Sequence, residues 1–218
     1  MSSNLLFESL IIFALTYFVC GIPFGLVVAS AKKGIDVRTK GSGNIGSTNV
    51  CRSAGVGAGA LTLLLDAGKG YVCIMGTKLY LKASLSLGFE QLGPQGKYFF
   101  LVSCVFLVAI LGHVFSPYLK FHGGKGIATG FGCAIAAVPL GALGILAVFL
   151  VVVLVSRYVS LGSICAAISL PIWVGCIYGV DFKVLGIYLI ISGIVIWAHR
   201  SNISRLIHGS ESKFTLSR

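Results

Sequence analysis

Residues 126–155 read GIATGFGCAIAAVPLGALGILAVFLVVVLV and hold no charged side chain. A transmembrane helix needs about 20 apolar residues, so this stretch is long for one crossing of a bilayer. Pro139, with Gly141 and Gly144 close behind it, lies near the middle, where a proline breaks a helix. We expect two helices here, which enter the membrane and return to the same side.

The whole chain shares this apolar character. Of its 218 residues, 56% are hydrophobic and 11% are charged, whereas soluble domains carry about 25% charged residues. We therefore predict an all-α, polytopic membrane helix bundle, one domain over residues 1–218, with five full spans and two short or broken helices. The candidate spans are residues 4–30, 61–83, 97–119, 126–155, 160–178 and 183–200.

The first span resembles a signal peptide, because Ala29-Ser30-Ala31 could be a cleavage site. A signal peptide has a basic start and an apolar stretch of about 7–15 residues. Here Glu8 is the only charge before Lys32, and the apolar stretch is longer, so we expect a retained span. Pro23 should bend it. Residues 53–60 are small and Gly-rich and could add a further short helix.

Basic residues set the expected orientation. The chain carries 17 Lys and Arg against six acids, a formal net charge of +11. Five of the basic residues follow the first span and none precedes it, which places the N-terminus outside and the C-terminus in the cytoplasm. Counting the crossings puts four polar stretches in the cytoplasm: residues 31–52, 120–130, 156–163 and 199–218.

The first of these stretches ends in GSGNIGSTNVCR, residues 41–52. Glycines let a backbone approach a ligand closely. Ser42 and Asn44 supply neutral hydrogen-bonding groups, and Arg52 offers a planar fork suited to phosphate. The alternative is a flexible loop with basic residues at the membrane surface.

The second stretch contains Gly123-Gly124-Lys125-Gly126 at the start of an apolar helix. Free amides at a helix start, followed by a lysine, suit an anion. This is not a nucleotide-binding P-loop, because Leu119 and Gly126 occupy positions that need glycine and Ser or Thr. Asp66 and Lys69, three residues apart, are interpreted as an ion pair at a helix end.

The third stretch begins at residue 199. If the helix continues beyond the membrane, His199, Asn202 and Arg205 share one face. Ser160 and Ser163, from the stretch at 156–163, also share a face and join the same surface. The alternative is that His199 is an ordinary histidine at the membrane interface, where a span ends, with no role in a site.

The residues that several common enzyme mechanisms need are not evident in the sequence. No Ser-His-Asp set and no metal-type His and Cys cluster is evident, and no histidine is followed five residues later by the acid of common glycerolipid acyltransferases. Neither a metal nor a cofactor is expected. Such a membrane protein suits either a reaction with an already activated donor or the transport of a small anion. Transport is disfavoured because no inverted repeat is evident and the spans hold almost no ionisable groups.

These three motifs, in order and spacing, resemble those of the bacterial acyl-phosphate-dependent glycerol-3-phosphate acyltransferases. The departures are mild, since Ile45 stands where that family usually has proline and Ser47 where it often has alanine. The resemblance implies a multi-pass protein of the bacterial inner membrane. It implies transfer of a fatty acyl group from acyl phosphate to the 1-hydroxyl of sn-glycerol 3-phosphate, giving lysophosphatidic acid and phosphate, the first acylation of phospholipid synthesis.

The resemblance also implies site residues. Those carried over as catalytic are Ser42, Arg52, His199 and Asn202, and those as substrate-binding or phosphate-binding are Asn44, Gly123, Gly124, Lys125, Gly126, Ser160, Ser163 and Arg205. We assign Arg52 and Lys125 to phosphate charge, and Ser42 and Asn202 to the alcohol or oxyanion.

The base could be His199 or the donor's own phosphate. The implied partners are glycerol 3-phosphate, acyl phosphate, membrane lipids and a soluble enzyme that makes acyl phosphate, with no nucleic acid among them. The donor's apolar tail is expected between helices, beside the bent first span.

Overall fold

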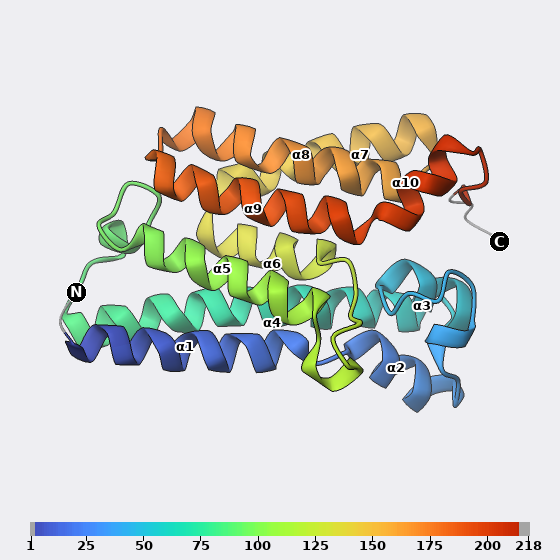
Figure 1. The fold of residues 1–218 in the computed structure, drawn as a ribbon, viewed down its shortest axis with the longest axis horizontal. Coiled ribbons are helices and arrows are strands. Elements are labelled where there is room, and N and C mark those ends of the chain that lie inside the picture. The colour runs from blue at the N-terminus through green and yellow to red at the C-terminus, as the bar shows by residue number, and fades with distance from the viewer. Residues whose placement is uncertain (1–2, 214–218) are drawn as a thin grey trace.

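The computed structural model describes residues 3–213, which form ten α-helices and three short 3₁₀ turns (Figure 1). The helices are α1 (Ser3–Gly21), α2 (Phe24–Lys33), α3 (Ser47–Ala54), α4 (Val56–Leu85), α5 (Phe99–Val114), α6 (Ile127–Ala137), α7 (Pro139–Ser156), α8 (Val159–Tyr178), α9 (Phe182–Ala198) and α10 (Arg200–Ile207). The 3₁₀ turns are Val37–Thr39, Phe89–Leu92 and Pro117–Leu119. The long helices run side by side along the longest axis of the molecule.

Five helical segments within residues 3–213 are long and apolar enough to cross a membrane, and α9 with α10 makes a sixth if that pair, bent by 59°, is one span. Large apolar side chains point outward from these helices; Leu154 is 78% exposed and Val155 83% exposed. Helices satisfy their own backbone hydrogen bonds, so this surface can face lipid. The predicted all-α membrane bundle is confirmed.

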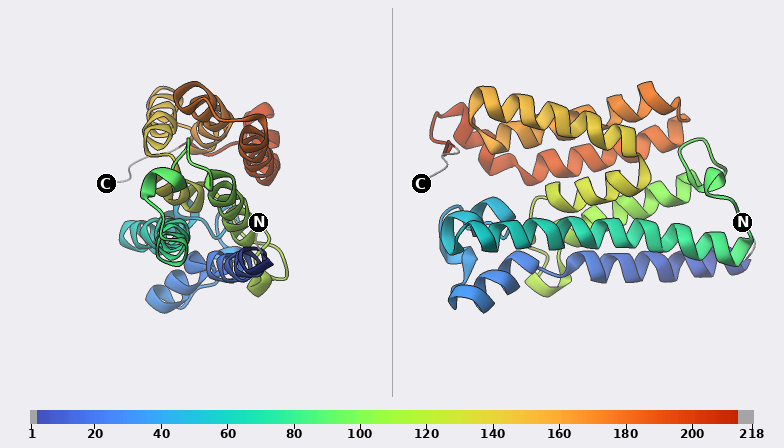
Figure 2. Two further views of the ribbon diagram at one scale, coloured as in Figure 1. Left: turned by 90° about the vertical axis from the view of Figure 1, so that its left-hand side faces the viewer. Right: turned by 180° about the vertical axis from the view of Figure 1, so that it is seen from behind.

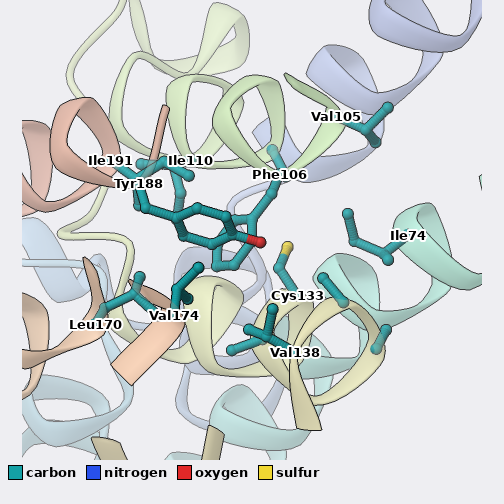
Figure 3. Close-up of a cluster of buried hydrophobic side chains, with 14 of the residues drawn as sticks. Ile74, Val105, Phe106, Ile110, Cys133, Val138, Leu170, Val174, Tyr188 and Ile191 are labelled. Carbon is teal, nitrogen blue, oxygen red and sulfur yellow. The ribbon is translucent and has the colours of Figure 1, made fainter. Parts of the chain in front are cut away.

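The helices fall into two groups. Seen from the end, α7, α8 and α9 lie on one side and α1, α4 and α5 on the other (Figure 2). Helix α6 lies between the groups and packs against α4, α5 and α7. A core of buried side chains that includes Phe106, Tyr188 and Val174 joins the groups (Figure 3).

The predicted break within 126–155 is confirmed. Helix α6 ends at Ala137, Val138 is not helical, and α7 begins at Pro139 and returns to the end of the bundle where α6 started. Carbonyls at a helix end have no partner within the helix. Lys78 of α4 supplies one, because its Nζ donates to the carbonyl oxygen of Ala136 at 2.7 Å.

The first span is also broken at Pro23, as the sequence predicts. Helix α1 ends at Gly21 and α2 begins at Phe24, although residues Leu5–Lys33 still make one candidate span. Two side chains accompany the break: Ser116 Oγ donates to the Gly21 carbonyl at 2.6 Å, and Lys69 Nζ donates to the Ile22 carbonyl at 2.7 Å.

The position predicted for a short helix is wrong. The short helix is α3, which ends before Gly55, and residues 56–60 belong to α4. Gly55 has φ +96°, a conformation that favours glycine, and it separates the two helices. Gly59 lies against the backbone and Cβ of Cys51, so α3 folds back tightly on α4. Half of the first motif is therefore helix rather than loop.

The expectation that the spans hold almost no ionisable groups is wrong as well. Asp66, Lys69, Lys78 and His113 lie in α4 and α5 and are all buried. Asp66 and Lys69 do pair, with 2.8 Å between Oδ1 and Nζ, but in the interior of α4 rather than at its end. The sequence pattern alone shows the pair and not its depth.

Replacement of Lys78 by methionine should destabilise the protein by about 1–3 kcal/mol, because the end of α6 loses a charged donor where water cannot replace it. Thermal unfolding in detergent measures this. Lys82→Met is the matched control, since Lys82 is an exposed residue one turn further along α4. Equal unfolding temperatures for the two variants would show that Lys78 does not hold α6.

Candidate active site

The polar stretches meet at one end of the bundle, which we call the site end. It holds α2, α3, the loop at 120–126, the start of α8 and α10, and lies at the right of Figure 1. A cavity of about 890 Å³ opens here and runs between the helices. Ten of the twelve predicted site residues line it: Ser42, Asn44, Arg52, Lys125, Gly126, Ser160, Ser163, His199, Asn202 and Arg205. Gly123 and Gly124 line an adjoining cavity of about 520 Å³ together with Ser42 and Lys125.

The first motif is shaped by Asn49, which is buried. Its Oδ1 accepts from the amide of Ser42 at 3.0 Å. Its Nδ2 donates to the carbonyls of Val37, Lys40 and Asn44. One side chain thus ties the loop to the start of α3. The amide oxygen of Asn44 is itself engaged, because it accepts from Gly46 at 2.8 Å.

The glycines of the second motif serve packing. The amides of Gly123 and Gly124 donate to the carbonyls of Val114 and His113, at 2.9 and 3.0 Å. These two amides are therefore engaged, and the free amides expected at the helix start belong to the first turn of α6. A Cβ on Gly124 would overlap the His113 ring, and one on Gly123 the His113 carbonyl.

His113 was not singled out from the sequence, yet it links the second motif to the membrane interior. Its Nδ1 lies 3.1 Å from Thr129 Oγ1 in the first turn of α6. The same nitrogen lies 3.8 Å from Asp66 Oδ1, and Asp66 pairs with Lys69. The loop before α6 is thus held by α5 and, through Asp66, by α4.

His199 occupies the junction between α9 and α10 and is 2% exposed. Its Nδ1 lies 2.8 Å from the carbonyl oxygen of Val195. A carbonyl can only accept, so Nδ1 carries the hydrogen and Nε2 of the neutral ring is the nitrogen that can accept. This tautomer makes His199 able to take a proton.

Glu211 is the site residue that the sequence did not reveal. Its Oε1 accepts from Ser160 Oγ and Asn202 Nδ2, both at 2.8 Å, and its Oε2 accepts from Arg205 Nε at 2.6 Å. Burial raises the pKa of Glu211, but these hydrogen bonds outweigh burial and hold the pKa below its usual range. One carboxylate thus gathers three predicted residues from α8 and α10.

The positive charges of the site come from Arg52, Lys125 and Arg205. Burial, together with the charges of Arg205 and Arg52, lowers the pKa of Lys125 to about 8. Two carboxylates line the cavity, and Asp66 is paired with Lys69, so three cations against Glu211 leave an excess of positive charge. Guanidinium and ammonium groups suit phosphate.

The deeper part of the cavity is apolar. Its walls include Phe106, Phe131, Leu146, Phe149 and Leu170, from α5 to α8. Within the described residues, none from α1 or α2 lines it, so the broken α6–α7 pair rather than the bent first span borders this space. A cationic site that continues into an apolar cavity between membrane helices defines a class: a membrane-embedded enzyme for an amphiphile with an anionic head.

Comparison with known proteins gives the family. The family model described as glycerol-3-phosphate acyltransferase matches residues 10–209. A glycerol-3-phosphate acyltransferase of Geobacter sulfurreducens is 43% identical over 95% of this chain and 98% of its own length, and one of Fusobacterium nucleatum is 40% identical over 92% and 95%. The crystal structure of PlsY (YgiH), an integral membrane glycerol 3-phosphate acyltransferase in its glycerol 3-phosphate form, is 36% identical, with a TM-score of 0.81 over 95% of this chain and 96% of that one. The chain belongs to the glycerol-3-phosphate acyltransferase family.

Replacement of Glu211 by alanine should lower kcat/KM at least tenfold. Ser160, Asn202 and Arg205 lose their common acceptor, and one charged hydrogen bond is worth about 1.5–3 kcal/mol. Steady-state acyl transfer in detergent measures the effect. Glu90→Ala, at the opposite end of the bundle, is the control; similar kinetics for both variants would remove Glu211 from the site.

Affinity for a phosphate-bearing substrate should fall as the pH rises through about 8, where Lys125 loses its proton and its charge. The substrate phosphate is already a dianion there, because its second pKa is about 6. In Lys125→Arg the guanidinium stays charged to beyond pH 12, so the alkaline decline of kcat/KM should disappear. An unchanged decline in the variant would assign it to another group.

Proposed function

We propose that this protein transfers a fatty acyl group from acyl phosphate to the 1-hydroxyl of sn-glycerol 3-phosphate, forming lysophosphatidic acid and inorganic phosphate. The observation that carries the proposal is the single cavity in which Arg52, Lys125 and Arg205 stand at the head of an apolar space. PlsY has been crystallised in a glycerol 3-phosphate form and in a lysophosphatidic acid form, which are the acceptor and the product of such a transfer.

The reaction can proceed without a covalent bond between the protein and the substrate. The acceptor hydroxyl oxygen attacks the carbonyl carbon of the donor, the bond from that carbon to the phosphate oxygen breaks, and phosphate leaves. Acyl phosphate is a mixed anhydride with a good leaving group, so no acyl-enzyme is needed. The protein holds two anions close together and stabilises the developing charge, which Arg52 and Lys125 can do for the phosphate.

In this proposal Asn202 binds the acceptor. Its Nδ2 is engaged by Glu211, and its buried Oδ1 has no hydrogen-bond partner among residues 3–213. A buried acceptor without a donor is costly, and the hydroxyl of a substrate would satisfy it. Asn202 therefore accepts from the alcohol in this proposal rather than donating to the oxyanion. The proton of the reacting hydroxyl goes to His199 Nε2 or to the leaving phosphate.

The proposal also includes the location and the orientation of the protein in the membrane. The site end faces the cytoplasm of a bacterial inner membrane, the N-terminus lies outside, and the chain is one acyltransferase domain. The support is the excess of basic residues at the site end. A soluble enzyme would supply the acyl phosphate.

The donor assay tests the function. With purified protein in detergent and glycerol 3-phosphate as acceptor, acyl phosphate should exceed acyl-CoA and acyl carrier protein in kcat/KM by roughly two to four orders of magnitude. A thioester presents no phosphate at its carbonyl and forfeits about two charged contacts of 1.5–3 kcal/mol each. Arg52→Lys, which keeps the charge but loses the planar fork, should reduce this preference. Comparable rates with all three donors would contradict the proposal.

A further inference from the structure

The apolar part of the cavity follows single faces of its helices and stops at one level. On α8 the lining residues include Ser160, Ser163, Ala167 and Leu170, spaced by three or four positions as on one helical face, with Val159 and Ala166 beside them. The next position on that face, Val174, is fully buried and does not line the cavity. The cavity therefore ends at Leu170 on this helix.

The neighbouring helices end the cavity at the same depth. The lining stops at Ile145 on α7, where the next residue on the face is Ala142, 3% exposed, and at Ile191 on α9, where it is Tyr188, 0% exposed. The Tyr188 ring packs edge-on against Phe106 of α5, with centroids 5.7 Å apart. Tyr188, Leu170, Val174 and Ile191 lie together in the core (Figure 3). These side chains form a closed floor.

The distance from the polar groups to the floor matches an acyl chain. From Ser160 to Leu170 is ten residues of α8, or about 15 Å at 1.5 Å per residue. An extended chain advances about 1.2 Å per bond, since three backbone bonds span about 3.6 Å. Chains of about 12 carbons and more therefore reach the floor.

An acyl chain reaches the floor only if it does not leave the cavity through its side wall. Leu63 of α4 is 47% exposed, and Phe131 of α6 and Phe149 of α7 are half-buried, so the cavity also borders lipid between α6 and α7. A chain that turned out through this wall would never touch Leu170. The lining face of α8 is buried at Ser160, Ala167 and Leu170. An acyl chain that stays along this face contacts Leu170.

From this geometry, and resting on the acyl transfer proposed above, we infer that Leu170 ends the acyl-chain site and limits the length of the chain that the enzyme accepts. The occupant is the hydrocarbon chain of the donor and of the lysophosphatidic acid product. Leu170 acts on specificity, since it touches the chain's end and lies far from the reacting carbon.

The test compares donors with 10, 14, 16 and 18 carbons. Leu170→Ala removes most of one side chain from the floor. The ratio of kcat/KM for the 18-carbon donor to that for the 10-carbon donor should rise at least fivefold, because each additional buried methylene of the donor strengthens its binding about fourfold. Ala167→Leu, one turn nearer the polar groups, should lower the same ratio by a similar factor. Ile172→Ala is the matched control, because Ile172 lies on the exposed face of α8.

Each outcome is decisive because each variant serves as its own reference through the ratio of long to short donors. Unchanged ratios in both variants, with an active wild type, would show that the chain leaves through the side wall and would overturn the inference. An inactive wild type with every acyl phosphate would instead overturn the proposed function.

Discussion

A helix that ends inside a bilayer exposes backbone groups that water cannot reach, and α6 ends in this way. In its last turn the carbonyl of Ala136 accepts a hydrogen bond from Lys78 of α4, 58 positions earlier in the chain. Its first turn is tied to His113 of α5 through Thr129. With both ends fixed, α6 begins with Ile127 and Ala128 at the cavity, and the dipole at a helix start favours an anion. The polar end of the cavity and the apolar space beside it both adjoin the helix pair that the break at Val138 creates.

The second organising feature is the tail that folds over the site. Glu211 binds residues of α8 and α10, and the carbonyl of Ser212 accepts from Arg52 of α3 at 3.5 Å. The first motif, the stretch at 156–163 and the third motif lie far apart in the sequence and are thus joined by one short segment after the last helix. Since the carboxylate neutralises only part of the local positive charge, the assembled site can still bind a dianion.

The sequence predicted what depends on local chemistry. Pro139 within an apolar run is enough to predict the broken helix pair, and the order of the three motifs is enough to predict most of the cavity's polar lining. Partners that are distant in the sequence leave no local signal. Glu211 looks like one acid in a basic tail, and Lys78 is one lysine within the predicted span 61–83 with no local sign of its partner. The contact of Gly124 with the His113 ring depends on the fold. That the Gly123 amide is engaged by Val114 also could not be predicted from the sequence, for the same reason.

The cavity borders lipid between α6 and α7, and its polar head lies at one end of the bundle. An amphiphile that leaves sideways through this wall, head at the site end and chain along the helices, enters a single leaflet in the orientation it needs there. No tumbling through water is required. Every molecule so released adds area to that leaflet alone, so growth of the opposite leaflet depends on lipid that crosses the membrane in a separate step.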